Sequence, residues 1–414
     1  MSALVVGTAL FATPPLTNAA TGTAIRDARL VLPFLYSVLA PICNVLDTIS
    51  FFSLRQHFAF LATCALAYAA WRFWRAPSET TRRARSCKEC LLAGLALLSV
   101  VTLYAGGTLL PRPIVRLAMA SPNSIVVDFH SHTSYSWDGR AEFTPEENRR
   151  WHQASGIDAA YVTDHGTFAG AVEAATQNPS RAGDGTVLLS GIEVRSTGRH
   201  LDILGTGAQD SAAYASDDLD AKRFMEIVRA RKSVPPVVLL TLPGNLRPAR
   251  NALPIDAVEI SDGAPRALAQ IDAQRERILG LAQQAGVAIV AGSNNHGWAR
   301  ALPSWSVMDI PGWRSMTPSE LDNAIRETLL QRGYGSVQVI ERRPVGPVSP
   351  AALALTVPLA IWRMLVTVSW TERFSWLCWI WLGYLVLGRL RVWARAAKRL
   401  EYSVEGPLYE PLGL

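Results

Sequence analysis

Two histidines separated by one residue, His130 and His132, follow an apolar run in the stretch VVDFHSHTSYSWDG, and Asp138 lies a few residues further on. The chain contains only seven histidines, so this pair uses two of them beside a carboxylate. Side chains at positions i and i+2 of a strand share a face, so two such imidazoles can bind one metal ion. The pair alone is weak evidence for a metal site.

Residues of the same types recur where other apolar runs begin or end. They are Asp164, His165, Glu193, His200, Asn294 and His296. Five of the seven histidines therefore lie at such positions, among carboxylates. Imidazole and carboxylate together are the ligands of hydrolytic metal sites. The joint pattern predicts a metal site far more strongly than the first pair does.

Segments with strand and helix patterns alternate from about residue 124 to 340, with short connections between them. One helix is predicted from Pro145, with Thr144 as its N-cap and Gly156 as its end. This alternation predicts a parallel sheet, either a barrel or a doubly wound sheet. The strand ends would then meet on one side, where active sites form. No glycine-rich nucleotide loop follows any predicted strand, so a nucleotide cofactor has no sequence support.

Four ordered motifs resemble those of the PHP superfamily, which is named after polymerase and histidinol phosphatase. They are DFHSHTSYSWDG, YVTDHG, GIEVRSTGRHLDILG and GSNNHGW. The resemblance implies an α/β fold, a distorted (β/α)7 TIM-like barrel, with up to three metal ions. The third motif is most similar to the exported branch that includes carbaryl hydrolase-like enzymes. Membrane segments are not part of the family pattern.

The resemblance also implies a role for each ligand-type residue. A first metal would be held by His130, His132 and Glu193, a second by Glu193 and His200, and a third by Asp138, His165 and His296. Glu193, as the bridging ligand, and Asp164 are the candidate catalytic carboxylates. The cofactors expected are two or three divalent ions of zinc, manganese or iron.

Two positions depart from the family pattern. Asn294 stands where the family usually has an aspartate on the first metal, and its neutral amide oxygen is a weaker ligand. Leu242 stands where the family usually has a histidine, and leucine cannot bind a metal. These departures leave open a degenerate barrel that serves as a binding or sensing module instead of an enzyme.

The function expected is that of a membrane-anchored metal-dependent hydrolase, specifically a phosphoesterase that uses a metal-bridging hydroxide. Arg195 and Arg199 lie between two ligand positions and are candidates for clamping a phosphate, or else surface charges of the rim. Trp298 is a candidate for the pocket wall, or else a packing residue. A hydrolase of non-phosphate esters or carbamates is the alternative within the same chemistry.

Composition adds membrane segments to this picture. Of 414 residues, 18% are charged and 49% hydrophobic, and the mean hydropathy is +0.15. Charges concentrate between about residues 125 and 345, and both ends are apolar. Uncharged runs of near-membrane length predict three helices before the soluble domain and two after it. These runs are residues 30–46, 56–71, 91–110, 344–362 and 374–388.

The expected organisation has five parts. They are an N-terminal segment (1–29), a membrane region (30–112), the PHP domain (122–343), a second membrane region (344–390) and a basic tail (391–414). Basic clusters flank the apolar runs, which favours topology signals over nucleic-acid binding. We expect a multi-pass protein of a bacterial-type inner membrane with an extracytoplasmic catalytic domain. Its expected partners are the lipid bilayer and a small phosphorylated or ester substrate.

Overall fold

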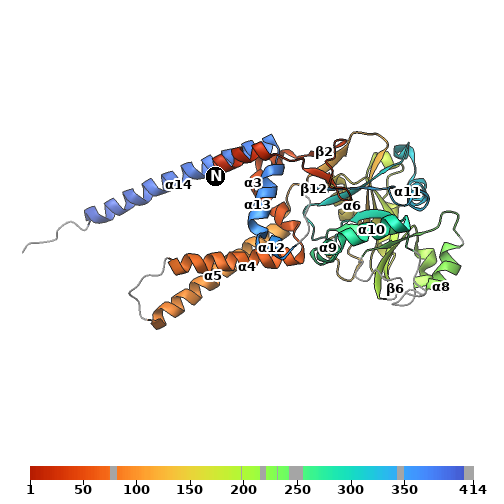
Figure 1. Cartoon of the computed structure of the whole chain (residues 1–414), viewed down its shortest axis with the longest axis horizontal. Helices are drawn as coiled ribbons and strands as arrows, with labels where there is room; N and C mark the ends of the chain where they lie inside the picture. The colour runs from red at the N-terminus through yellow and green to blue at the C-terminus, as the bar shows by residue number, and fades with distance from the viewer. Residues whose placement is uncertain are drawn as a thin grey trace, which may run out of the picture.

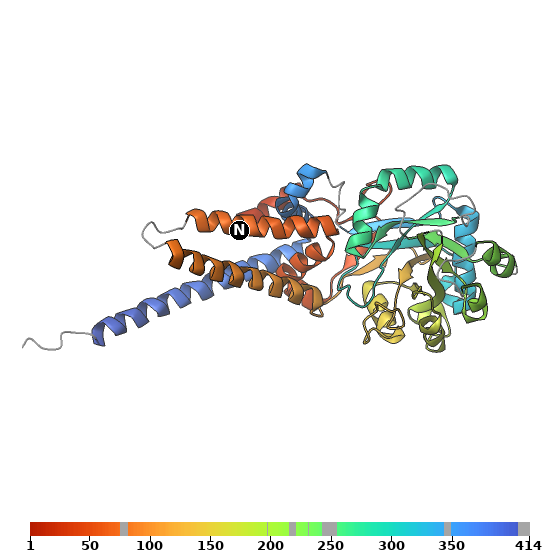
Figure 2. The same ribbon diagram turned by 90° about the horizontal axis from the view of Figure 1, so that it is seen from below.

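The computed structural model describes residues 1–74, 82–196, 198–214, 221–230, 232–241, 255–342 and 349–404. An α/β body lies at one end of the molecule, and long helices extend away from it at the other (Figure 1). The view from below shows the same division, with helices packed around the outside of a curled sheet (Figure 2). The predicted site residues all belong to the α/β body.

Ten strands form one sheet, in the order β1-β12-β11-β4-β5-β6-β7-β8-β9-β10, and β2 pairs with β3 separately. Their bounds are β1 Leu16–Asn18, β2 Ala28–Val31, β3 Arg116–Met119, β4 Ser124–Ser131, β5 Ala159–Val162, β6 Val187–Ser196, β7 Arg199–Leu204, β8 Val237–Leu240, β9 Ala257–Asp262, β10 Ala288–Gly292, β11 Ser304–Asp309 and β12 Gln338–Arg342. Just beyond β10, the Asn294 amide donates a hydrogen bond to the His130 carbonyl over 2.8 Å. The sheet therefore curls until the end of β10 lies beside β4. The seven strands β4 to β10 form a barrel-like ring.

The sheet is mixed, which corrects the expectation of a parallel sheet. Pairs β4–β5, β5–β6, β8–β9 and β9–β10 are parallel, whereas β7 is antiparallel to both β6 and β8. Only residues 197 and 198 separate β6 from β7. A parallel connection needs a crossover of a dozen residues or more, so this short link produces a hairpin. Strands β11, β12 and β1 continue the sheet beyond β4 with antiparallel pairing.

The helices of the α/β body follow the predicted alternation. They are α6 Pro145–Ser155, α7 Ala169–Thr176, α8 Ala221–Phe224, α9 Pro265–Asp272, α10 Arg275–Ala285 and α11 Pro318–Arg332. The predicted ends of α6 are confirmed: the Thr144 hydroxyl accepts from the Glu147 amide, and Gly156 adopts a left-handed conformation with φ of +80°. These helices cover apolar side chains of the strands, among them Tyr161, Ile203 and Val290, which are fully buried.

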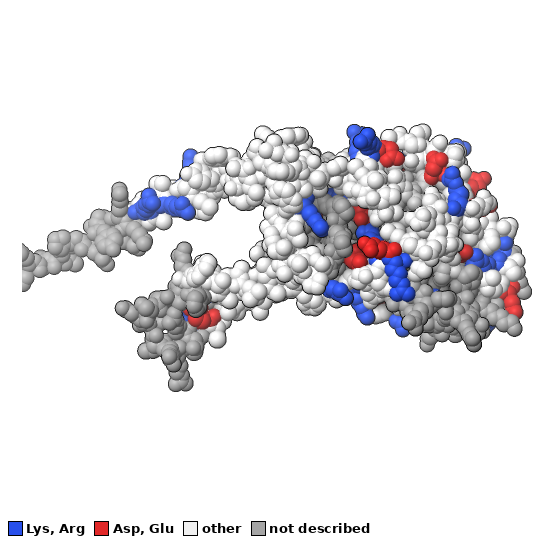
Figure 3. Space-filling model, in the orientation of Figure 1, with Lys and Arg blue, Asp and Glu red and all other residues white. Residues whose placement is uncertain are grey.

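The remaining helices lie in the N-terminal and C-terminal parts of the chain. They are α1 Ser2–Gly7, α2 Phe34–Val38, α3 Ala40–Ser50, α4 Leu54–Trp74, α5 Arg82–Leu109, α12 Pro350–Ala354, α13 Thr356–Thr367 and α14 Trp370–Val404. In both views α4 and α5 run side by side, and α14 extends furthest from the sheet (Figures 1 and 2). On the face shown in Figure 3, charged residues are sparse along these helices and lie mainly on the distal part of α14 and at the free ends of α4 and α5.

The expectation of five membrane helices is not supported. Within the described residues, only Lys88–Gly107 of α5 and Trp370–Ala396 of α14 are long and apolar enough to cross a bilayer, by length and composition. The run 30–46 is divided between α2 and α3, and the run 344–362 between α12 and α13. Each piece is shorter than the roughly 20 residues that a bilayer requires. A multi-pass location therefore lacks structural support.

A buried ionic cluster joins the helical region to the sheet. Asp47 of α3 accepts hydrogen bonds from Arg342, at the end of β12, over 2.9 Å and from Arg112 over 2.8 Å. Tyr36 of α2 donates to Asp47 over 2.8 Å and accepts from Arg342 over 2.6 Å. The Asp47 and Arg342 side chains are almost fully buried. The junction is therefore a specific packed interface.

Candidate metal centre

Four parts of the curled sheet bring the predicted ligand residues together. His130 lies in β4, His165 just after β5, Glu193 in β6 and His296 just after β10. Isolated parallel bridges extend the pairing beyond the strands, between Ser131 and Asn295 and between His165 and Glu193. The loop segments that follow β5 and β10 are thus held in register with their neighbours.

The three residues predicted for the first metal form a compact, buried set. His130 Nε2 lies 3.0 Å from His132 Nε2, and Glu193 Oε2 lies 3.3 Å from each of these nitrogens. An ion bound at about 2.1 Å to all three atoms would see them at roughly 90–105° to one another. Such angles are ordinary for four- to six-coordinate metals, so these residues fit a metal ion.

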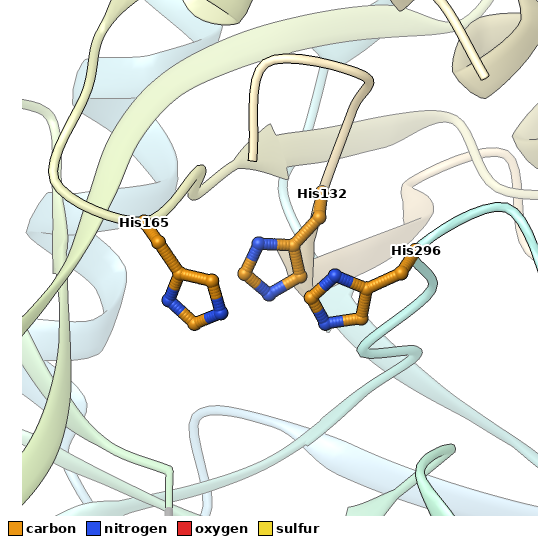
Figure 4. Close-up of side chains that lie close together, drawn as sticks. All are labelled: His132, His165 and His296. Atoms are coloured by element: carbon orange, nitrogen blue, oxygen red, sulfur yellow. The ribbon is translucent and has the colours of Figure 1, made fainter. Parts of the chain in front are cut away.

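The residues predicted for the third metal also meet. Asp138 Oδ1 lies 3.1 Å from His296 Nδ1, and Asp138 Oδ2 lies 3.5 Å from His165 Nε2. His132 lies between the other two imidazoles (Figure 4). Its ring stacks on that of His296, with centroids 3.9 Å apart. Ligand nitrogens of His132, His165 and His296 lie within 4.8 Å of one another, so this set adjoins the first.

Glu193 connects these sets to the residue predicted for the second metal. Its Oε1 lies 2.7 Å from His200 Nδ1, while its Oε2 faces His130, His132 and, at 3.2 Å, His165 Nδ1. The Glu193 carboxylate is therefore shared by four imidazoles. This is the contact pattern of a bridging ligand, because each oxygen faces a different group of nitrogens. Leu242, which stands where the family pattern usually has a histidine, lies outside the described residues.

Asn294 is placed differently from its predicted partners. Its Oδ1 lies 2.9 Å from His296 Nε2, and its Nδ2 donates to Asp262 over 3.1 Å. Its φ of +44° is the only positive value among the described non-glycine residues. Asparagine tolerates this left-handed conformation better than most residues. The side chain therefore braces His296 instead of lying in the compact set of His130.

Metal binding requires neutral imidazoles and ionised carboxylates. Burial would lower the pKa of His130, but nearby Asp202 and Glu259 raise it well above its usual value. Three other ligand groups are shifted in the direction that favours a metal. Burial lowers the pKa of His132 well below its usual value. Burial also lowers the pKa of His296 to about 4, against the opposing charge of Asp138. Burial alone would raise the pKa of Glu193, but hydrogen bonds from the surrounding histidines hold it well below its usual value. At neutral pH these three groups are ready to bind a cation.

Asp164, the second candidate catalytic carboxylate, plays a supporting part in this geometry. It is fully buried and accepts from the Thr133 amide over 2.6 Å and from the Thr133 hydroxyl over 2.7 Å. These bonds hold the loop that follows His132. Ser136 in the same loop lies 3.0 Å from His132 Nδ1 and accepts from the His165 amide over 3.0 Å. Asp164 therefore positions ligands through its neighbours.

A buried pair below the site orients β4. Asp128 Oδ2 lies 2.7 Å from His152 Nε2, and Asp128 Oδ1 accepts from the amides of His130 and Ser293 over 3.1 and 2.9 Å. Burial would raise the pKa of Asp128, but the hydrogen bonds from His152 and Ser293 outweigh it and lower the pKa. His152 is thus a structural histidine with both ring nitrogens hydrogen-bonded.

The three predicted substrate-binding residues occupy the rim. Arg195 is exposed and pairs with His200 across the β6–β7 hairpin, so the two side chains share a face. Arg199 pairs with Ser196, one position away, and therefore belongs to the opposite face. Trp298 is 53% exposed, with the Arg140 guanidinium 4.9 Å from its ring centroid. Of the two arginines, only Arg195 lies on the ligand face of the hairpin.

Sequence reasoning missed several residues of the site. Trp137, which is 80% exposed, stacks on His165 with ring centroids 5.8 Å apart. Asp202, Glu259 and Asp262 are fully buried next to the first ligand set. The sequence contains a signal for these three residues, because each is a carboxylate within an apolar strand. Such residues are almost never buried without a partner, which makes them candidates for chemistry.

No family model and no curated protein sequence matches the chain. Among solved structures, PsfC from Pseudomonas syringae is similar, with 15% identity, a TM-score of 0.38, and coverage of 58% of this chain and 98% of that one. A two-domain protein from Bacteroides vulgatus, described as containing a PHP-like metal-dependent phosphoesterase, has 16% identity, a TM-score of 0.31, and coverage of 49% and 63%. A lesion-specific endonuclease from Pyrococcus furiosus has 12% identity, a TM-score of 0.38, and coverage of 52% and 57%. Likenesses this distant assign no activity to the chain.

Proposed function

We propose that this protein is a metal-dependent hydrolase of the PHP type and that its substrates are phosphoesters. The observation that carries the proposal is the shared Glu193 carboxylate, which contacts four histidines, with Asp138 completing a second ligand set beside it. Two adjacent ligand sets joined by one carboxylate are the arrangement that hydrolytic centres with several metals require. The ordered sequence motifs point in the same direction.

The bound ions would lower the pKa of a shared water to near neutrality and offset charge on the phosphoryl oxygens. The protein's own residues do the rest. His130, His132 and Glu193 would hold the ions, and Asp164 holds the loop that follows His132. Arg195, on the same face as His200, is positioned to pair with a phosphate as it enters.

Metal content and activity test the proposal together. Full-length protein in detergent is assayed with bis(p-nitrophenyl) phosphate and p-nitrophenyl acetate, and its metals are counted by mass spectrometry. Asp138→Asn removes one ligand charge with little change of shape. Glu142→Gln is the matched control, because the Glu142 side chain is 77% exposed and pairs with Arg140 outside the ligand sets.

We expect Asp138→Asn to bind fewer metal equivalents, and its phosphodiesterase rate to fall about 10- to 100-fold. Glu142→Gln should match the wild type in both measurements. Turnover of the acetate ester alone would favour the ester and carbamate alternative. A folded wild-type protein that holds no metal and turns over neither compound would refute the hydrolase proposal and favour a binding or sensing module.

We also propose that α5 and α14 anchor the barrel to a membrane. Leu95, Leu98 and Leu103 of α5 are exposed, as are Trp381 and Tyr384 of α14. Exposed apolar side chains along a helix of spanning length are typical of contact with lipid. Alkaline carbonate washing of membranes tests this, because an anchored protein stays with the pellet. Recovery in the wash would contradict the proposal.

A further inference from the structure

Three buried carboxylates surround the far side of His130, away from Glu193. They are Asp202, Glu259 and Asp262, each fully buried. His130 Nδ1 lies 3.5 Å from Glu259 Oε1 and 3.7 Å from Asp202 Oδ2. Ligand atoms of His130, Glu259 and Asp262 lie within 4.8 Å of one another. None of these carboxylates belongs to the ligand sets described above.

Most polar atoms of this inner cluster lack a hydrogen-bond partner among the described residues. They are His130 Nδ1, both carboxylate oxygens of Asp202 and both of Glu259. The separations of 3.5 and 3.7 Å are longer than hydrogen bonds to the imidazole allow. A buried polar group without a partner destabilises the fold, and a buried unpaired charge does so far more. The cluster therefore needs a further group to bind.

The cluster is also rich in acidic groups. The groups with the strongest electrostatic effect on Asp202 and Glu259 are His130 and other carboxylates. Asp262 is the exception in its bonding, because it accepts from the Ala264 amide over 2.6 Å and from Asn294 Nδ2 over 3.1 Å. Its side chain is therefore held in place beside the two free carboxylates. A cation is the ligand that such groups bind once they are ionised.

The backbone leaves room for this arrangement at one glycine. A Cβ added to Gly292, at the end of β10, would lie 2.1 Å from Glu259 Oε1 and 2.5 Å from the His130 Cβ. Any larger residue at this position would displace the carboxylate from the cluster. The absence of a side chain at residue 292 thus allows Glu259 to approach His130.

We propose that His130 Nδ1, Asp202, Glu259 and Asp262 bind an additional divalent metal ion, on the opposite side of His130 from the hydrolytic centre. An ion at about 2.1 Å from atoms separated by these distances would see them at roughly 110–125°, which is ordinary metal geometry. Two of the three carboxylates would balance its charge when ionised, and imidazole with carboxylates suits manganese, iron or zinc. With both sites filled, His130 would offer Nε2 to the hydrolytic centre and Nδ1 to this ion, and its ring proton would be released as the metal binds.

Protons are the competing occupants. Burial raises the pKa of Glu259 well above its usual value, and the neighbouring Asp262 adds to the rise. Burial likewise raises the pKa of Asp202 well above its usual value. Both shifts favour the neutral carboxyl when no metal is bound. Metal binding and protonation both remove the charge, so the number of bound ions distinguishes them.

The decisive experiment empties the outer sets without altering the inner cluster. A triple variant, His132→Ala with His165→Ala and Glu193→Gln, is purified full-length in detergent, stripped of metal and dialysed against Mn²⁺. We expect one equivalent of Mn²⁺ to stay bound and to raise the thermal unfolding midpoint. Adding Glu259→Gln to this background should remove the equivalent, whereas adding the exposed-site change Glu142→Gln should not.

The outcomes separate this inference from the proposed function. Wild-type protein that binds Mn²⁺, together with a folded triple variant that binds none, would overturn the inner site and leave the hydrolytic centre standing. If the triple variant binds one equivalent of Mn²⁺ but the wild type shows no turnover, the inner site is supported and the hydrolase proposal is refuted. If Glu259→Gln fails to fold, Asp202→Asn replaces it, and retention of the full equivalent in that folded variant would also overturn the inference.

Discussion

Replacing Gly170 by alanine tests the close packing that supports the metal centre. Gly170 lies in the first turn of α7, where a Cβ would be 2.1 Å from Asp164 Oδ2 and 2.5 Å from Thr133 Oγ1. Both atoms belong to the bonds that hold the loop after His132. The clash must displace either α7 or the Asp164 carboxylate, because the contact falls more than 1 Å short of ordinary van der Waals separation.

The expected magnitude follows from two opposing effects. Overpacking costs about 1–3 kcal/mol, and a contact this short belongs near the upper end of that range. Alanine in place of glycine within a helix returns about 1 kcal/mol. We therefore expect Gly170→Ala to destabilise the fold by about 2 kcal/mol and to lower the unfolding midpoint by roughly 4–8 °C.

Gly280→Ala is the matched control. Gly280 lies within α10, and a Cβ there meets nothing within 4 Å. This variant should gain the helix contribution alone, about 1 kcal/mol, with a midpoint higher by roughly 2–4 °C. Thermal unfolding of both variants in the same detergent gives the comparison. If Gly170→Ala were stabilised as much as Gly280→Ala, the close approach of α7 to Asp164 would be wrong.

Three further predictions concern the rest of the fold. Burial raises the pKa of Asp158 to about 6, so between about pH 4 and 6 the folded state holds a proton that the unfolded state has lost. Lowering the pH through this window should stabilise the wild type, and Asp158→Asn should flatten that part of the pH profile of the unfolding midpoint. Thr317→Ala removes the capping box with Glu320 at the start of α11 and should cost about 1 kcal/mol in denaturant unfolding. Asp47→Ala leaves Arg342 buried without its carboxylate and should cost about 3–5 kcal/mol, so an unchanged midpoint would contradict a buried pair.

The predicted ligands lie close together because each is near the end of an apolar run that the sequence predicts as a strand. His130 and Glu193 follow apolar runs whose strand character is local, and the ends of neighbouring strands in one sheet lie close together. Because Asp164 directly precedes the predicted ligand His165, its position in the sequence could not show that it has a different role. Its carboxylate turns toward Thr133, a contact that depends on the fold of the loop. Asp164 and His165 both lie beyond the end of β5, so the course of the loop decides where each side chain points.

Other features depend on contacts that no local pattern encodes. The pairing of β1 with β12 joins residues from the two ends of the chain, for example Leu16 with Arg342. β11 was not predicted either, although Trp305 in it is fully buried and donates to the Ser155 carbonyl over 3.0 Å. The number of membrane helices was overestimated partly because apolar composition was counted without the breaks between α2 and α3 and between α12 and α13. The run 56–71 lies in the continuous helix α4, which is not among the helices apolar enough to span.

The position of β1 has a consequence for the order of events during biosynthesis. Among the described strands, β1 has β12 as its neighbour in the sheet, and roughly 320 residues separate the two along the chain. A ribosome adding about 5–20 residues per second needs roughly 15–65 s to make that stretch. During this time one edge of β1 can bond to residues 23–25, through the Asn18 amide and the Leu16 carbonyl, but the edge that faces β12 exposes its backbone donors and acceptors. The sheet can acquire this edge only near the end of translation, so nascent chains that stall before β12 should be especially vulnerable to proteases.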